Sequence, residues 1–100
     1  MANAQRAVFK NGIASYKGKN YDTADTLTLG TGSQSDKSFA FINTVSDNRE
    51  LKKEFAGKMV VIERIYIERK VIFINAKVIS GPGENLIIDL EAAVDNDEIK

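Results

Sequence analysis

Two long apolar runs in the second half of the chain constrain its fold most. The first run, residues 59–67, is apolar at 59–62 and again at 65–67, and its apolar phase shifts at Glu63 and Arg64. A shift of this kind is typical of a β-bulge, which bends a strand and re-aims its side chains. The run therefore predicts a long strand that bends around the corner of a barrel-like sheet.

The second run, residues 71–79, predicts a strand with apolar side chains on both faces. Its even positions are all apolar and several odd positions are apolar too: Ile72, Ile74, Ala76 and Val78 against Val71, Phe73 and Ile79. A strand covered on one side would alternate apolar with polar residues, so we expect part of this strand to be covered on both sides. A chain this short forms few elements that could cover a second sheet face. We therefore expect some of the apolar side chains at odd positions, together with Tyr16 and Tyr21, to contact a partner through a flat surface.

Shorter segments predict the other strands. Asn11-Gly12 separates two apolar stretches and is the pair best suited to a type I′ hairpin, in which both central residues take positive φ. Residues 17–25 are rich in Gly, Asn and Asp and predict a loop. Alternating apolar residues predict further strands at 26–29, 38–45 and 86–90. The residues after the last strand either continue it or begin a helical turn.

One short helix is predicted to begin at Asp47, which can cap its N-terminus. Glu50, three residues later, would complete a capping box, and Gly57 supplies a C-terminal stop. A helix of about nine residues is marginal on its own. Leu51 and Phe55 lie one turn apart, so we expect both to dock on the sheet.

The chain of 100 residues contains no Cys, His or Trp, which limits its chemistry. Without thiols or imidazoles, disulfides and the usual zinc and copper sites are excluded, and no spacing is typical of a catalytic acid–base pair. Its apolar runs are far shorter than the roughly 20 residues of a membrane span. We expect a protein that is no enzyme, needs no cofactor and contacts no membrane.

We predict one domain over residues 1–100, mainly β with one short helix, built as a small, partly open β-barrel or sandwich of about six or seven strands.

Charge is distributed unevenly between the two ends, although the formal net charge is zero. Residues 1–20 hold four basic side chains and no acidic one, whereas residues 81–100 hold six acidic side chains and one lysine. The two ends are either solvated or paired within one chain, or they attract the opposite ends of other copies, head to tail. The second alternative gives a candidate protein interface, to which one aromatic residue of the second long run is added: Arg6, Lys10, Lys17, Phe73, Asp95, Asp97 and Glu98.

The segment 37–42, KSFAFI in sequence, offers a different kind of site. Two aromatics at i and i+2 share one face of a strand, and beside a lysine they can stack on successive bases of a single-stranded nucleic acid. The segment resembles the ribonucleoprotein motif of RNA-recognition and cold-shock domains at five of six positions, with Ser38 in place of glycine. The alternative to a core or interface strand is therefore an OB-like module that binds nucleic acid through Lys37, Phe39 and Phe41. Whether the rings of Phe39 and Phe41 are buried or exposed decides between a core strand and a nucleic-acid-binding face.

Two further segments contain residue types found in binding loops. Residues 30–33, GTGS, follow a strand as phosphate-binding loops do, but a second strand is expected next instead of a helix, so we interpret them as a hairpin turn. Residues 95–98, DNDE, collect oxygen ligands suited to a divalent cation, yet they lack the glycine and the distant glutamate of an EF-hand loop. We interpret them as a solvated acidic tail.

Residues 25–33, 37–42 and 88–94 with 97–99 resemble small uncharacterised proteins of gut Bacteroidetes and of their crAss-like tailed phages. This resemblance implies a phage-encoded chain and, for a compact β domain, a virion component such as an auxiliary capsid protein. It offers no catalytic residue to carry over. We therefore expect a structural protein that binds other protein subunits, either the major capsid protein or copies of itself, in the virion or in the cytoplasm of the host cell.

Overall fold

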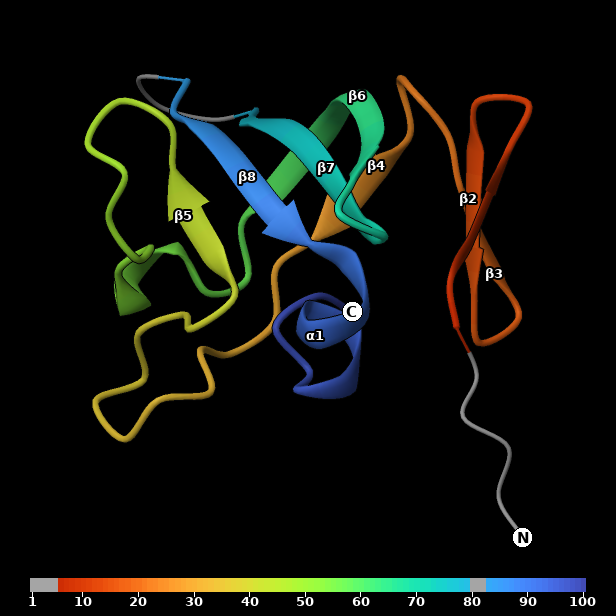
Figure 1. Ribbon diagram of the computed structural model, residues 1–100. Coiled ribbons are helices and arrows are strands. Elements are labelled where there is room, and N and C mark those ends of the chain that lie inside the picture. The colour runs from red at the N-terminus through yellow and green to blue at the C-terminus, as the bar shows by residue number, and fades with distance from the viewer. Residues whose placement is uncertain (1–5, 80–82) are drawn as a thin grey trace, which may run out of the picture.

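The structure is a computed structural model that describes residues 6–79 and 83–100, which form eight strands in two antiparallel sheets and one short α-helix (Figure 1). The predicted fold class, mainly β with one short helix, is confirmed, although the helix follows the last strand instead of beginning at Asp47. Because the sheets do not close into a barrel, the sandwich is the predicted architecture that fits. In chain order the elements are β1 (Val8–Lys10), β2 (Ile13–Tyr16), β3 (Lys19–Tyr21), β4 (Thr26–Thr28), β5 (Ile42–Thr44), β6 (Met59–Glu68), β7 (Val71–Val78), β8 (Asn85–Asp89) and α1 (Leu90–Asp95).

Strands β1, β2 and β3 form a small sheet whose strands are joined by two tight turns. The first is the predicted Asn11-Gly12 turn, where φ is 54° and 80°. The second is Lys17-Gly18, where φ is 50° and 79°. Positive φ at both central residues is the mark of a type I′ turn, whose twist suits the flanking strands. β3 lies in the segment predicted as a loop, because its polar residues show no strand pattern before they pair with β2.

The larger sheet has the strand order β4-β6-β7-β8-β5. β6 and β7 form its centre and are joined by a tight turn at Arg69-Lys70, where φ is 52° and 67°. Their register shifts between Ile62 and Arg64, which confirms the predicted bulge. Both long apolar runs of the sequence therefore form strands at the middle of the sheet.

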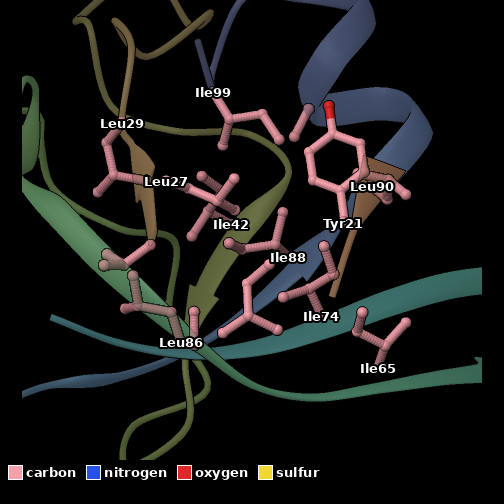
Figure 2. Packing of buried hydrophobic residues seen from close by; sticks show 14 of the residues in the cluster. Tyr21, Leu27, Leu29, Ile42, Ile65, Ile74, Leu86, Ile88, Leu90 and Ile99 are labelled. Atoms are coloured by element: carbon pink, nitrogen blue, oxygen red, sulfur yellow. The ribbon is translucent and has the colours of Figure 1, made fainter. Parts of the chain in front are cut away.

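The hydrophobic core lies on one face of the five-stranded sheet (Figure 2). Ile74 and Ile88 project from the sheet, and Leu90 of α1 and Ile99 close over them. Each fully buried side chain of this size contributes about 1.5–3 kcal/mol of transfer free energy. Tyr21 of β3 is 3% exposed and Tyr16 of β2 is 5% exposed, so these two tyrosines are core residues instead of partner contacts.

The helix predicted to begin at Asp47 is replaced by a segment that pairs with the sheet. The N–H of Leu51 donates to the carbonyl of Ile42 at 2.9 Å, so the chain returns along the edge of β5. Backbone groups used in this pairing are not free to form a helix. Within the predicted helix, the structure forms a single 3₁₀ turn, Lys53–Phe55. Leu51 is fully buried, as expected for a docking residue, and Phe55 is partly buried.

Candidate interaction face

The sheet face opposite the core presents apolar side chains to solvent. Along β7 the side chains alternate between buried and half-buried, and Phe73 belongs to the half-buried set. Further along the same face Met59 and Ile79 are 47% and 54% exposed, and they are neighbours because the Ile79 N–H donates to the Met59 carbonyl. We call this surface the open face. Its members come from four neighbouring strands and the residue after β7: Asn43, Met59, Val61, Arg64, Tyr66, Glu68, Val71, Phe73, Asn75, Lys77, Ile79, Asn85, Ile87 and Asp89.

The strand at residues 71–79 is expected to be covered partly on both faces. In the described part of the chain, no segment covers the second face. The predicted division of the strand into two apolar faces is nevertheless correct. Ile72 and Ile74 point into the core, whereas Val71 and Phe73 lie on the open face. The surplus apolar side chains of this strand thus form a half-buried to exposed surface of the folded chain.

Two aromatic rings form a row across the open face. The strand register pairs Tyr66 with Phe73, and Phe73 in turn with Asp89. The two ring centroids lie 5.6 Å apart with their planes inclined by 26°, which is a stacked pair. The guanidinium carbon of Arg64 lies 4.7 Å from the centroid of the Tyr66 ring in a cation–π contact. Phe73, a predicted interface residue, therefore lies between Tyr66 and Asp89 in this row.

A groove of about 360 Å³ opens beside this row. Among the described residues that line it, the charged ones are both acidic, and the others are aromatic, aliphatic or amide side chains: Ala40, Phe41, Asn43, Asn48, Tyr66, Glu68, Phe73, Ile87 and Asp89. The pKa of the Asp89 carboxyl is raised, mainly by burial. The N–H of Ala92, which donates to this carboxyl at 3.4 Å, offsets part of that rise. The groove thus combines ring surface with negative charge.

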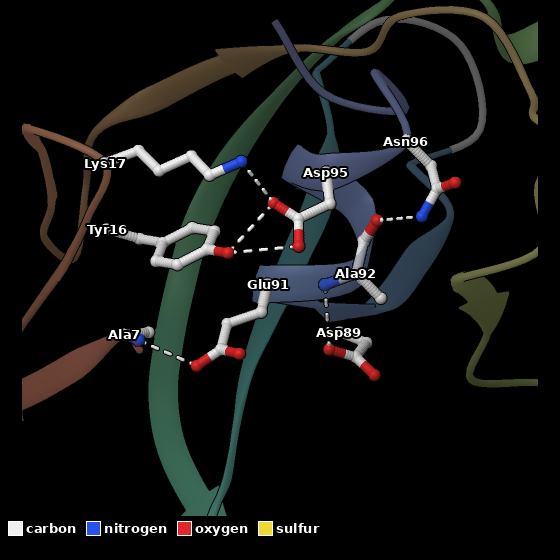
Figure 3. A network of polar contacts seen from close by, with 8 residues as sticks. All are labelled: Ala7, Tyr16, Lys17, Asp89, Glu91, Ala92, Asp95 and Asn96. Atoms are coloured by element: carbon white, nitrogen blue, oxygen red, sulfur yellow. Dashed lines mark hydrogen bonds and ion pairs between the residues drawn. The ribbon is translucent and has the colours of Figure 1, made fainter. Parts of the chain in front are cut away.

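The charged ends of the chain meet within the monomer, at the contact between the three-stranded sheet and α1 (Figure 3). The Nζ of Lys17 lies 2.7 Å from a carboxylate oxygen of Asp95, and the Tyr16 hydroxyl donates to the same carboxylate at 2.9 Å. These hydrogen bonds lower the pKa of Asp95, first through Lys17 and then through Tyr16. The same contact with Asp95 raises the pKa of Lys17. For these residues the structure shows pairing within one chain.

A second contact joins the start of the described chain to α1. The N–H of Ala7 donates to the carboxylate of Glu91 at 2.7 Å, and the Arg6 Nε lies 3.6 Å from the same oxygen. Of the remaining predicted interface residues, Lys10 ends β1 beside the first turn and is exposed, and Asp97 is exposed after α1. The structure therefore brings Arg6 close to the acidic end of the chain and leaves Lys10 and Asp97 at the surface.

Glu98 corrects the interpretation of residues 95–98 as a solvated tail. Its side chain is fully buried. One oxygen accepts from the N–H and the hydroxyl of Ser33, at 3.0 and 2.6 Å, and from the N–H of Ala40 at 2.7 Å, while the other accepts from the N–H of Phe41 at 2.9 Å. A buried carboxylate is tolerated where donors surround it in this way. Glu98 is therefore a structural residue, and its place in the predicted interface is wrong.

The glycines of residues 30–33 serve this packing, and the segment is not the predicted hairpin turn. A Cβ on Gly30 would overlap the carbonyl oxygen of Asp97, and a Cβ on Gly32 would overlap the carbonyl oxygen of Lys37. The Gly30 N–H also donates to the Glu98 carbonyl at 2.8 Å. Only residues without a side chain permit so close an approach of two backbone segments.

The nucleic-acid face predicted at Lys37, Phe39 and Phe41 is not formed. Phe39 is fully buried in the core, Phe41 is partly buried, and Lys37 is exposed. The expected strand is confined to β5, because the amides just before it donate to Glu98 instead of to a neighbouring strand. A ring that stacks on a base must be accessible. The burial of Phe39 therefore excludes the predicted stacking pair.

Tyr66 and Asp89 were missed as members of a candidate site. A signal for Tyr66 was present: beyond the bulge, Arg64, Tyr66 and Glu68 recur at every second position and share the side of the strand opposite Ile65. Nothing local marks Asp89, which joins the site only through the pairing of β8 with β7.

Within residues 6–79 and 83–100, no three His, Cys, Asp or Glu side chains are grouped so as to hold a metal ion. In the same ranges no helix has the length and apolar character needed to cross a membrane. Comparison of the chain with protein-family models, with curated proteins and with solved structures finds no match.

Proposed function

We propose that this protein is a non-enzymatic structural subunit that binds other protein subunits through the open face. The observation that carries the proposal is the exposure of apolar side chains on a regular sheet surface, with Met59 and Ile79 about half exposed and Phe73 at the centre. Exposed apolar side chains on such a regular surface mark an interaction site, because leaving them in water is unfavourable.

The composition of the open face also supports a protein partner. Interface cores are enriched in aromatic residues and arginine, and these dominate the binding energy when they are well packed. Tyr66, Phe73 and Arg64 form such a group on two adjacent strands. These residues lie on paired strands, so no loop has to be ordered when a partner binds.

The head-to-tail contact between copies has fewer charged residues to carry it than the sequence predicts. Arg6 and Lys17 already pair with acids of their own chain, which leaves Lys10 and Asp97 as the exposed members of the predicted charged interface. Exposed ion pairs contribute about 0–1 kcal/mol each. We therefore place the main contact on the open face and assign the charged ends to the stability of the monomer.

A virion role is the specific form of this function that we propose. The sequence resemblance to phage and Bacteroidetes proteins and the small β-rich fold support an auxiliary capsid protein, found in the virion or in the cytoplasm of the host. The major capsid protein or further copies of the chain would be its partners. An auxiliary subunit of this kind needs an exposed contact face and no catalytic centre.

Native mass spectrometry of the tagged chain, purified gently from cells that produce it together with its natural neighbours, tests the proposal. We expect the wild type to retain a partner subunit at fixed stoichiometry. Ile79→Asp should lose that subunit, because a carboxylate would be buried in an apolar contact. Val8→Asp, an equally exposed apolar position on the three-stranded sheet, is the matched control and should retain it. Retention by both variants would place the contact elsewhere.

A further inference from the structure

We propose that the groove of the open face receives a basic side chain, an arginine or a lysine, presented by a partner protein. This inference rests on the proposed function and adds the chemistry of the partner. The groove is lined by the ring of Phe73 and by the carboxylates of Glu68 and Asp89. These are the two kinds of group that attract a cation, one through the ring quadrupole and the other through charge.

The first argument is charge complementarity. Glu68 and Asp89 are the charged residues among the described lining, and both are acidic. In the described part of the chain neither takes part in an ion pair, since the basic end of the chain pairs with Glu91 and Asp95. A partner that covers the open face removes water from both carboxylates, which is costly unless a cation replaces that water.

The second argument is that this face already holds one guanidinium against an aromatic ring. Arg64 lies over Tyr66, and Tyr66 stacks on Phe73. The row continues to Asp89, the register partner of Phe73 on β8. A second guanidinium placed between the Phe73 ring and Asp89 would repeat the Arg64 arrangement one strand further along, with a carboxylate added.

The third argument concerns the remaining hydrogen-bonding capacity. The amide side chains of Asn43 and Asn48 line the same groove and supply acceptors for the further N–H groups of a guanidinium. The acidic lining disfavours a phosphate backbone, because it would place like charges together. A neutral sugar could also stack on the rings, but it would leave two carboxylates without a counter-charge. We therefore favour a basic protein side chain over both.

Titration of the folded, isotope-labelled protein with small probes tests this inference by the amide chemical shifts of the open face. The probes are Nα-acetyl-arginine methylamide, its citrulline counterpart, which has the same shape but no charge, and maltotriose as a neutral sugar. We expect saturable shifts at Phe73, Ile87 and Asp89 with the arginine probe and at least tenfold weaker binding of the citrulline probe. Shifts confined to other surfaces, equal binding of the two amino-acid probes, or binding of maltotriose alone would overturn the inference.

Two variants and one control identify the carboxylates involved. Asp89→Asn removes the charge and keeps an N-cap for α1, because asparagine caps as well as aspartate. Glu68→Gln changes an exposed side chain and should leave folding intact. We expect each to weaken binding of the arginine probe about tenfold, whereas Glu63→Gln, an exposed position on the same strand outside the groove, should not. If both variants bind the arginine probe as well as the wild type does, the inference is wrong. If Glu68→Gln then still retains the partner subunit, the proposed function holds without a basic side chain in the groove.

Discussion

The carboxylate of Glu98 accepts a 2.6 Å hydrogen bond from the hydroxyl of Ser33, 65 residues earlier in the chain. The same carboxylate accepts from the main-chain N–H groups of Ala40 and Phe41. One buried side chain near the C-terminus therefore holds the irregular segment between β4 and β5. That segment carries the start of β5, an edge strand of the sheet that bears the open face.

Replacing Glu98 by glutamine should destabilise the protein strongly. The amide would direct a donor group at backbone N–H donors and would remove charge-assisted hydrogen bonds, so we expect a loss of about 2–4 kcal/mol in the free energy of unfolding. Urea denaturation followed by circular dichroism measures it. Glu54→Gln, at an exposed position, should change stability by less than about 0.5 kcal/mol. Similar small losses in both variants would mean that Glu98 does not hold the segment.

Gly32→Ala should also destabilise the fold, because the added methyl group would overlap the carbonyl oxygens of Lys37 and Ser38. Backbone must move to relieve such an overlap, which typically costs about 1–3 kcal/mol. Thermal unfolding of the variant should show a clearly lower Tm. Ser35→Ala, at an exposed position of the same segment, is the control and should unfold close to the wild type.

The turn between β6 and β7 offers a stabilising change. Arg69 and Lys70 both take positive φ, which costs roughly 1–2 kcal/mol for each residue with a side chain. Replacing the pair by Asn-Gly supplies residues suited to a type I′ turn and should raise the free energy of unfolding by about 1 kcal/mol. Lys52→Gly, where φ is −78°, should instead lower it. A turn variant no more stable than the wild type would contradict the described turn.

Some of this architecture follows from local sequence, and some does not. The long strands β6 and β7, the bulge after Ile62 and the Asn11-Gly12 turn leave patterns within a few residues, and all three were predicted. The helix at Asp47 had an equally good local signal, but pairing along the edge of β5 overrides it. A capping box contributes about 1 kcal/mol, whereas the pairing supplies three backbone hydrogen bonds, donated by Phe39, Thr44 and Leu51, of about 0.5–1.5 kcal/mol each.

The candidate site divides in the same way. Phe73 was predicted because its strand has more apolar residues than one core face can use. Asp89 was not, because it reaches the aromatic row through strand register alone. Local sequence assigns Glu98 to a solvated tail, because nothing near it in sequence distinguishes a buried carboxylate from an exposed one. Its donors lie 57 to 65 residues away.

The contact between Asp95 and Lys17 should make stability depend on acid pH. Hydrogen bonds from Lys17 and Tyr16 lower the folded pKa of Asp95 below its ordinary value of about 3.9, so the stabilisation is complete above that value and is lost as pH falls through the folded pKa. The wild type should therefore exceed Asp95→Asn by up to about 1 kcal/mol between roughly pH 5 and 8, and the gap should close between about pH 4 and 2.

Denaturation curves at each pH check this difference. Asp47→Asn, at an exposed position that caps no helix, is the control and should follow the wild type at every pH. A gap between wild type and Asp95→Asn that stays constant down to pH 2 would show that the carboxylate charge of Asp95 is not involved.

Photo-crosslinking from the open face tests the central claim most directly. A photoreactive phenylalanine replaces Phe73 in the full chain, is activated in the cells that produce the protein, and its adducts are identified by mass spectrometry. We predict one defined protein species, crosslinked at Phe73, absent when the same probe replaces Val8 and lost when Ile79→Asp is added. Adducts that are the same at Phe73 and Val8, or that consist of nucleic acid, lipid or sugar in place of protein, would contradict a protein-binding open face.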